Sequence, residues 1–233
     1  MYIFSMENPF WRFVGRVVDL VWINVLTLVC CLPVFTIGAA ISAMDKILIQ
    51  IVVKEEGSLT KGYFKAFKEN FKRSTVVWLP SLFALLILFY NAWLIHQGVM
   101  DGLGKGMITV AGVSIGILAV VIVSVLQYYL ALTARFDADL KQTLKNAGLL
   151  AFAFFPRTLS ILVIMLFPVA LMMLSDYFLM FWFVYGLAIP GYFIAQIFAG
   201  IFYKIQLTQT MDEVEADALV EKTEELSDAS TIE

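Results

Sequence analysis

Two adjacent ionisable residues, Asp45 and Lys46, follow a long charge-free segment and are the residues of this chain best placed to do chemistry. An ionisable side chain inside a membrane span is a functional-site hypothesis by default, because it is disfavoured there by about 2.5 to 3.5 kcal/mol on insertion scales. If residues 17–54 fold back as a hairpin, Asn24 and Asp45 lie at the same depth on opposite helices. Asp19 and Gln50 likewise share a depth. The candidate intramembrane polar cluster consists of Asn24, Asp45, Lys46 and Gln50.

Asp45 and Lys46 can lie in either of two environments. In the first, both residues are buried in the membrane, and Asp45 is satisfied by Asn24 or by a lysine from another helix. In the second, both lie in the interface, where the Lys46 side chain reaches water at little cost.

A basic, aromatic segment between residues 61 and 73 is the second candidate site. On a helical wheel its four lysines fall within about one quadrant and its three phenylalanines form a stripe about 90° away. This pattern is typical of a helix on a membrane surface, where each ammonium gains about 1 kcal/mol from anionic headgroups. A similar segment runs from 138 to 155. The candidate residues for contact with the lipid surface or for partner docking are Lys61, Phe64, Lys65, Phe67, Lys68, Phe71, Lys72, Lys141 and Lys145.

Other chemistry finds little support in the residues. A metal site needs several converging ligands, and the chain has one histidine, His96, and two adjacent cysteines, Cys30 and Cys31. It contains no phosphate-binding GxxxxGK[ST] motif and no nucleophile with an apparent base. We therefore expect a protein that is not an enzyme, has no cofactor or metal, and does not bind nucleic acid.

The elements that position these residues are apolar helices. The chain has 233 residues and is 61% hydrophobic, with a mean hydropathy of +0.86. Stretches without Asp, Glu, Lys or Arg run over 20–44, 74–100, 106–134, 158–175 and 177–203. About 20 apolar residues suffice for a helix to cross a bilayer, and these stretches lack the alternation of barrel strands. The predicted fold class is all-α, a polytopic transmembrane helical bundle.

The number of spans depends on the first stretch. Basic residues favour the cytoplasmic side, and a single crossing would leave Arg12 and Arg16 outside. A turn is predicted over 32–38, because Pro33 cannot continue a helix, Thr36 can cap the next one and Gly38 permits a tight backbone approach. We therefore predict six spans, with five as the alternative if 37–53 lies on the surface. The predicted spans are 17–34, 37–54, 75–97, 107–132, 157–175 and 179–203.

The charge divides the chain into two parts. Residues 209–233 contain nine acids and one base, a net charge of −8, against −3 for the whole chain. We predict a single transmembrane domain over 1–207 and a solvated, frayed, acidic cytoplasmic tail over 208–233.

Two further patterns bear on the helices. A shift of 76 positions aligns Pro80 with Pro156, each expected to open a transmembrane helix, which would fit a recurring unit of surface helix and hairpin. Gly112 and Gly116 form a GxxxG pair, which favours close packing inside the bundle over dimerisation.

Several segments together resemble the YesL-like family of bacterial membrane proteins, over about residues 1–207. They are Asn8-Pro9-Phe10-Trp11-Arg12-Phe13, the stretch from Cys31 to Ala39, Lys54-Glu55-Glu56-Gly57, the stretch from Phe64 to Lys72, and that from Leu140 to Ala147. The resemblance implies a domain of unknown function, often encoded beside carbohydrate-uptake transporters and polysaccharide-degrading enzymes, mostly in Gram-positive bacteria. It supplies no catalytic residues.

The leading function hypothesis is a non-enzymatic accessory protein of carbohydrate uptake or utilisation. It would dock through its basic surface helices to a partner such as an ABC-type carbohydrate transporter, and the carbohydrate link rests on the resemblance alone. The alternative is an independent small-solute transporter or channel. We expect a multi-pass protein of the bacterial cytoplasmic membrane, in contact with anionic headgroups and with both termini in the cytoplasm.

Overall fold

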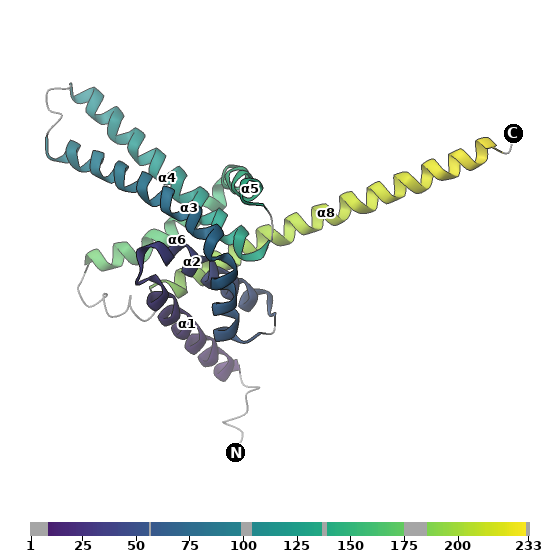
Figure 1. Cartoon of the computed structure of the whole chain (residues 1–233), viewed down its shortest axis with the longest axis horizontal. Helices are drawn as coiled ribbons and strands as arrows, with labels where there is room; N and C mark the ends of the chain where they lie inside the picture. The colour runs from purple at the N-terminus through teal and green to yellow at the C-terminus, as the bar shows by residue number, and fades with distance from the viewer. Residues whose placement is uncertain (1–8, 56, 99–103, 137–138, 175–185, 232–233) are drawn as a thin grey trace, which may run out of the picture.

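The computed structural model describes residues 9–55, 57–98, 104–136, 139–174 and 186–231, which form helices joined by short connections (Figure 1). In chain order the elements are α1 (Pro9–Cys31), the short 3-10 helix η1 (Val34–Thr36), α2 (Ile37–Val53), α3 (Leu59–His96), α4 (Lys105–Arg135), α5 (Leu140–Ala153), α6 (Phe155–Leu174) and α8 (Ala188–Thr231).

Within the described residues, six helical segments are long and apolar enough to cross a membrane. They run over Val14–Cys31, Val34–Val53, Leu59–His96, Gly106–Arg135, Phe155–Met173 and Ala188–Leu207. The predicted fold class, a helical membrane bundle, is confirmed. We placed the start of the sixth span at 179, which lies outside the described residues, and the described helix begins at Ala188.

The predicted turn between the first two helices is confirmed, but the predicted role of Thr36 is wrong. The Thr36 side chain makes no capping bond to α2. Its hydroxyl instead lies 2.5 Å from the carbonyl oxygen of Cys30 and 2.6 Å from that of Pro33. Because the last carbonyls of a helix lack partners within it, this hydroxyl stabilises the end of α1 rather than the start of α2.

Helix α2 is the core of the bundle and packs against α1, α3, α4 and α8. Within its apolar segment 61% of the residues are buried, against 39% at most in the other five segments. Small residues at Gly38, Ala39, Ala40 and Ala43 let its neighbours approach closely. A Cβ built on Gly38 would lie 2.7 Å from the Cβ of Trp78.

Helix α3 joins two elements that we predicted to be separate. The basic segment 61–73 and the span 75–97 form one helix of 38 residues, with Pro80 inside it rather than at its start. Figure 1 shows that α3 bends between its basic first part and its apolar second part. Proline has no amide hydrogen to donate to the carbonyl four residues earlier. Where neighbouring helices support the helix before and after it, a proline therefore kinks the helix rather than ending it.

The second part of α3 and helix α4 form an antiparallel hairpin that projects from the bundle (Figure 1). Our prediction that Gly112 and Gly116 provide close packing is wrong, because a Cβ on either glycine would meet no atom within 4 Å. Gly116 instead lines an apolar groove between the two arms, together with Phe89 and Ala92.

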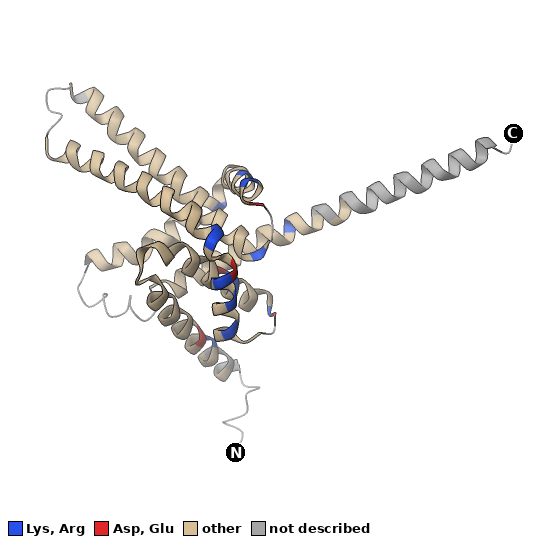
Figure 2. Cartoon of the chain, in the orientation of Figure 1, with Lys and Arg blue, Asp and Glu red and all other residues tan. Residues whose placement is uncertain are grey.

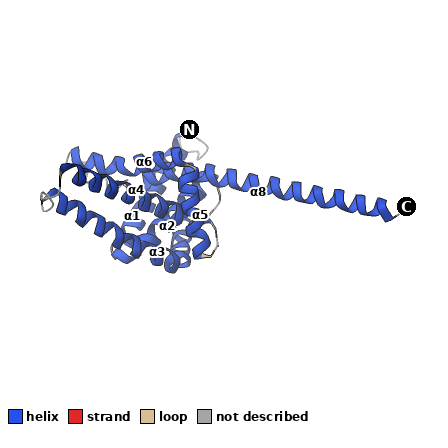
Figure 3. Cartoon of the chain, turned by 90° about the horizontal axis from the view of Figure 1, so that it is seen from above, coloured by secondary structure: helices blue, strands red, loops and turns tan. Residues whose placement is uncertain are grey.

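Helix α8 runs from Ala188 through Thr231, so the last span and most of the acidic tail are one continuous helix. It extends away from the bundle in both views (Figures 1 and 3). The predicted fraying is therefore wrong for the backbone up to Thr231. Residues 212–225 are rich in Glu, with two Ala and neither Gly nor Pro, a composition that favours helix, and this explains the difference.

Candidate functional site

The first part of α3 packs antiparallel to α2 through one face. Tyr63, Ala66, Asn70 and Ser74 are buried there, at the spacing of adjacent helical turns. The Tyr63 hydroxyl donates to the carbonyl oxygen of Ala40, at 3.2 Å. These contacts hold the basic segment of α3 firmly on the bundle.

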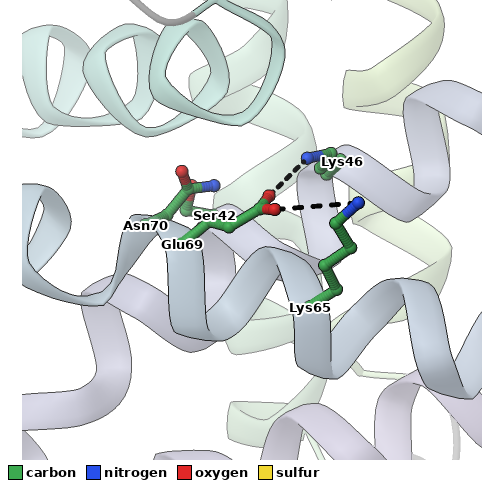
Figure 4. Close-up of polar contacts among 5 residues, drawn as sticks. All are labelled: Ser42, Lys46, Lys65, Glu69 and Asn70. Atoms are coloured by element: carbon green, nitrogen blue, oxygen red, sulfur yellow. Dashed lines mark hydrogen bonds and ion pairs between the residues drawn. The ribbon is translucent and has the colours of Figure 1, made fainter.

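A chain of hydrogen bonds joins α3, α2 and α4. The Asn70 amide nitrogen Nδ2 donates to Ser42 Oγ at 3.3 Å, and the two residues lie next to Glu69 in the close-up of Figure 4. Ser42 Oγ in turn donates to the carbonyl oxygen of Leu130, at 3.2 Å. Since Ser42 and Asn70 are both buried, satisfying their polar atoms stabilises this three-helix junction.

Lys46 turns towards α3 rather than towards Asp45. Its ammonium Nζ lies 3.2 Å from Glu69 Oε2, and Lys65 Nζ lies 3.9 Å from Glu69 Oε1 (Figure 4). The Lys46 side chain is 31% exposed and that of Glu69 47%, so the pair lies at the edge of the bundle. A partly exposed pair of this kind stabilises the fold by no more than about 1 kcal/mol.

Asn24, in the middle of α1, holds the start of α8. Its side-chain oxygen Oδ1 accepts hydrogen bonds from the backbone amides of Leu187 and Ala188, both at 3.0 Å. The first amides of a helix have no partner within it, and Pro190 has no amide hydrogen to satisfy. Asn24 therefore caps the N-terminus of α8 from within the core, by accepting these two amides.

Asp45 is buried, with 2% of its surface exposed, and its Oδ2 has no hydrogen-bond partner among the described residues. It lies one turn after Ser42 on α2. Our depth argument set Asn24 opposite Asp45, but the Asn24 oxygen serves the amides of α8. We also expected a lysine partner as the other possibility, and no described lysine forms an ion pair with Asp45.

Gln50 lies apart from these residues, one turn before the end of α2, and is half-buried. Its backbone carbonyl accepts the amide of Glu55, at 3.0 Å, where the chain leaves the helix. Lys54 ends the helix in the left-handed conformation, with φ of 58°. The four residues of the predicted polar cluster thus occupy different surroundings and show no common ligand-binding geometry.

The basic residues gather on the side of the bundle from which α8 extends (Figure 2). On α3 the exposed basic residues lie on the side of the helix opposite its buried face. On α5 they lie opposite the buried Thr143, Ala147 and Ala151. We call these exposed lysines the basic surface: Lys61, Lys65, Lys68 and Lys72 of α3 with Lys141 and Lys145 of α5.

The predicted phenylalanine stripe is only partly available to a membrane or partner. Phe64 is 47% exposed. Phe67 packs against the core, and Phe71 lies between Phe67 and Phe35, with ring centroids 5.7 and 6.5 Å away. Two of the three rings therefore serve packing, which the helical wheel could not show because it lacks the partner helix.

No group of three or more His, Cys, Asp or Glu within the described ranges could hold a metal ion. His96 is exposed at the end of α3, and both cysteines are free. The fold and these sites define a polytopic helical membrane protein whose buried core helix, α2, carries a few polar side chains.

Comparison with protein families gives one match. Residues 20–92 match the family described as a protein of unknown function, DUF624, in agreement with the resemblance to YesL-like membrane proteins. The matched residues include α2 and most of α1 and α3, and hence Asn24, Asp45 and the basic residues of α3. The comparisons with curated proteins and with solved structures gave no match.

Proposed function

We propose that this chain is a non-enzymatic membrane protein that docks, through the basic surface, to an acidic cytoplasmic surface of a transporter complex serving carbohydrate uptake. The observation that carries the proposal is the packing of α3. Its buried face fixes the helix on α2, which leaves Lys61, Lys65, Lys68 and Lys72 outward in a defined array.

A helix already fixed on the bundle favours docking, because its backbone has little further order to gain on association. Opposite charges across an interface steer encounter and fix the register of the partners. The carbohydrate link rests on the family resemblance. The cytoplasmic placement rests on the preference of Lys and Arg for that side of the membrane.

The proposal predicts that the tagged full-length chain, purified in mild detergent from a native host, carries transporter subunits with it. Changing Lys61, Lys65, Lys68 and Lys72 to Glu should reduce their recovery by about tenfold or more, equivalent to a loss of about 1.4 kcal/mol or more. Quantitative mass spectrometry of the eluate measures this.

The matched control changes the same four lysines to Arg, which keeps the charge and should keep the partner. Size-exclusion chromatography shows whether both variants remain folded. Recovery of the wild-type chain alone, or equal recovery with the Glu and Arg variants, would contradict docking.

Independent solute transport is the second candidate, and one observation favours it. Asp45 is a buried carboxyl group in the central helix, and buried ionisable groups mark substrate and ion pathways in transporters. Flux of sugars or ions in liposomes containing only this chain, abolished in Asp45→Asn, would support transport. Liposomes as tight as protein-free ones favour docking.

A further inference from the structure

We propose that Asp45 is a proton-binding site inside the bundle. Its carboxyl group carries a proton at neutral pH and releases it when α2 separates from the helices around it. The proposal is independent of docking and assigns a ligand, the proton, to a residue that docking does not use.

Burial and the absence of a donor are the first observations. Asp45 is 2% exposed, and its Oδ2 has no hydrogen-bond partner in the described part of the chain. An ionised carboxylate accepts several hydrogen bonds and is strongly disfavoured in an apolar environment without them. In proteins such a group usually becomes neutral instead.

The cations nearest in the sequence do not compensate a charge on Asp45. Lys46 pairs with Glu69 on α3, as does Lys65. On α4, Arg135 Nη1 lies 2.7 Å from Glu55 Oε1.

The other titratable groups around α2 lie on α1, α3, α4 and α8, and none of those described forms an ion pair or hydrogen bond with Asp45. Arg16 lies 3.5 Å from the Tyr192 hydroxyl of α8. Tyr129 donates to the carbonyl oxygen of Arg73, and Tyr128 accepts from Thr158. The remaining groups on these helices whose side chains the structure describes are Asp19, Cys30, Cys31, Lys61, Tyr63, Lys68, Lys72, Arg73, Tyr90, His96, Tyr203 and Lys204.

A proton on Asp45 removes the charge without any movement of these groups. When α2 moves so that water reaches Asp45, the carboxyl group ionises as an ordinary aspartic acid does, above about pH 4. Proton release and helix separation are therefore linked, and acid conditions favour the closed bundle.

Infrared spectroscopy of the full chain in detergent at neutral pH tests the proposal. The wild type should show the carbonyl stretch of a protonated carboxylic acid, and Asp45→Asn should lack it. Glu69→Gln is the matched control, since Glu69 is half-exposed and paired, and should leave this band unchanged. Unfolding the wild type in strong detergent at the same pH should also remove the band, which gives a reading even if Asp45→Asn does not fold.

Stability against pH provides a second reading. Between about pH 5 and about pH 7 the unfolded state releases the Asp45 proton while the folded state keeps it. The unfolding equilibrium constant should therefore rise more steeply with pH in the wild type than in Asp45→Asn. The difference should be up to about tenfold for each pH unit. A wild type without the carboxylic acid band, or with the same pH slope as Asp45→Asn, would overturn the proposal and show that Asp45 is ionised.

Discussion

Asn24→Leu is expected to lower the free energy of unfolding by about 2 to 6 kcal/mol. The substitution keeps the size of the side chain but removes the oxygen that accepts the amides of Leu187 and Ala188. Each buried amide left without an acceptor destabilises the fold by about 1 to 3 kcal/mol. Unfolding in mixed micelles of mild and denaturing detergent measures the change.

Asn91→Leu is the matched control for this prediction. Asn91 Nδ2 donates to the carbonyl oxygen of Ile87 in its own helix, and this side-chain bond supports no second helix. We expect a change within about 0.5 kcal/mol, as at sites without special packing. Equal stability of the Asn24 and Asn91 variants would show that Asn24 does not hold the start of α8.

Gly38→Ala should destabilise the bundle by about 1 to 3 kcal/mol, because the added methyl group overpacks the contact between α2 and α3. Its Cβ would lie 2.7 Å from the Cβ of Trp78 and 3.2 Å from the carbonyl oxygen of Ser74. Neither atom is the end of a flexible side chain, so the helices themselves must separate. The same unfolding measurement applies.

Substitutions at two other glycines serve as comparisons for Gly38→Ala. At Gly191 the added Cβ meets the side-chain ends of Leu48 and Met44, which can move, so Gly191→Ala should have a smaller effect. At Gly112 it meets nothing within 4 Å. Gly112→Ala should be neutral or stabilising, by up to about 1 kcal/mol, from the higher helix propensity of alanine. A Gly38→Ala protein as stable as Gly112→Ala would contradict the close contact.

The sequence was sufficient to predict the apolar helices, because the charge-free stretches have the length that a bilayer requires. It also located the turn after Cys31 from Pro33. It was insufficient for α3, where the change from basic to apolar residues near 74 suggested a boundary. Helical hydrogen bonding continues across such a change in polarity, and the direction of the helix depends on what it packs against.

The polar core was harder to predict than the spans. A depth argument places Asn24 and Asp45 at a similar level, but it does not give the direction in which each side chain points around its helix. The role of Asn24 depends on α8, more than 160 positions later. The sequence indicated a tight backbone approach at Gly38 but not its partner, Trp78. It also drew attention to Gly112 and Gly116, where no such contact forms.

The burial of α2 accounts for the different surroundings of its two neighbouring ionisable residues. Lys46 is at the edge, where a surface glutamate compensates it, whereas Asp45 faces the interior without a partner. The α2–α3 contact thus presents the α3 lysines of the basic surface outward and keeps one carboxyl group inside.

The central proposal is a chain that crosses the membrane six times, with the basic surface and both termini on the cytoplasmic side. The most direct test places a single cysteine at Tyr2, in a chain with Cys30 and Cys31 changed to Ser, and probes it with a membrane-impermeant thiol reagent. A cysteine at Gly102, in the connection between α3 and α4, is the control and should react in intact cells. We predict that Tyr2→Cys reacts only after the cells are permeabilised; reaction in intact cells would contradict the six-span arrangement.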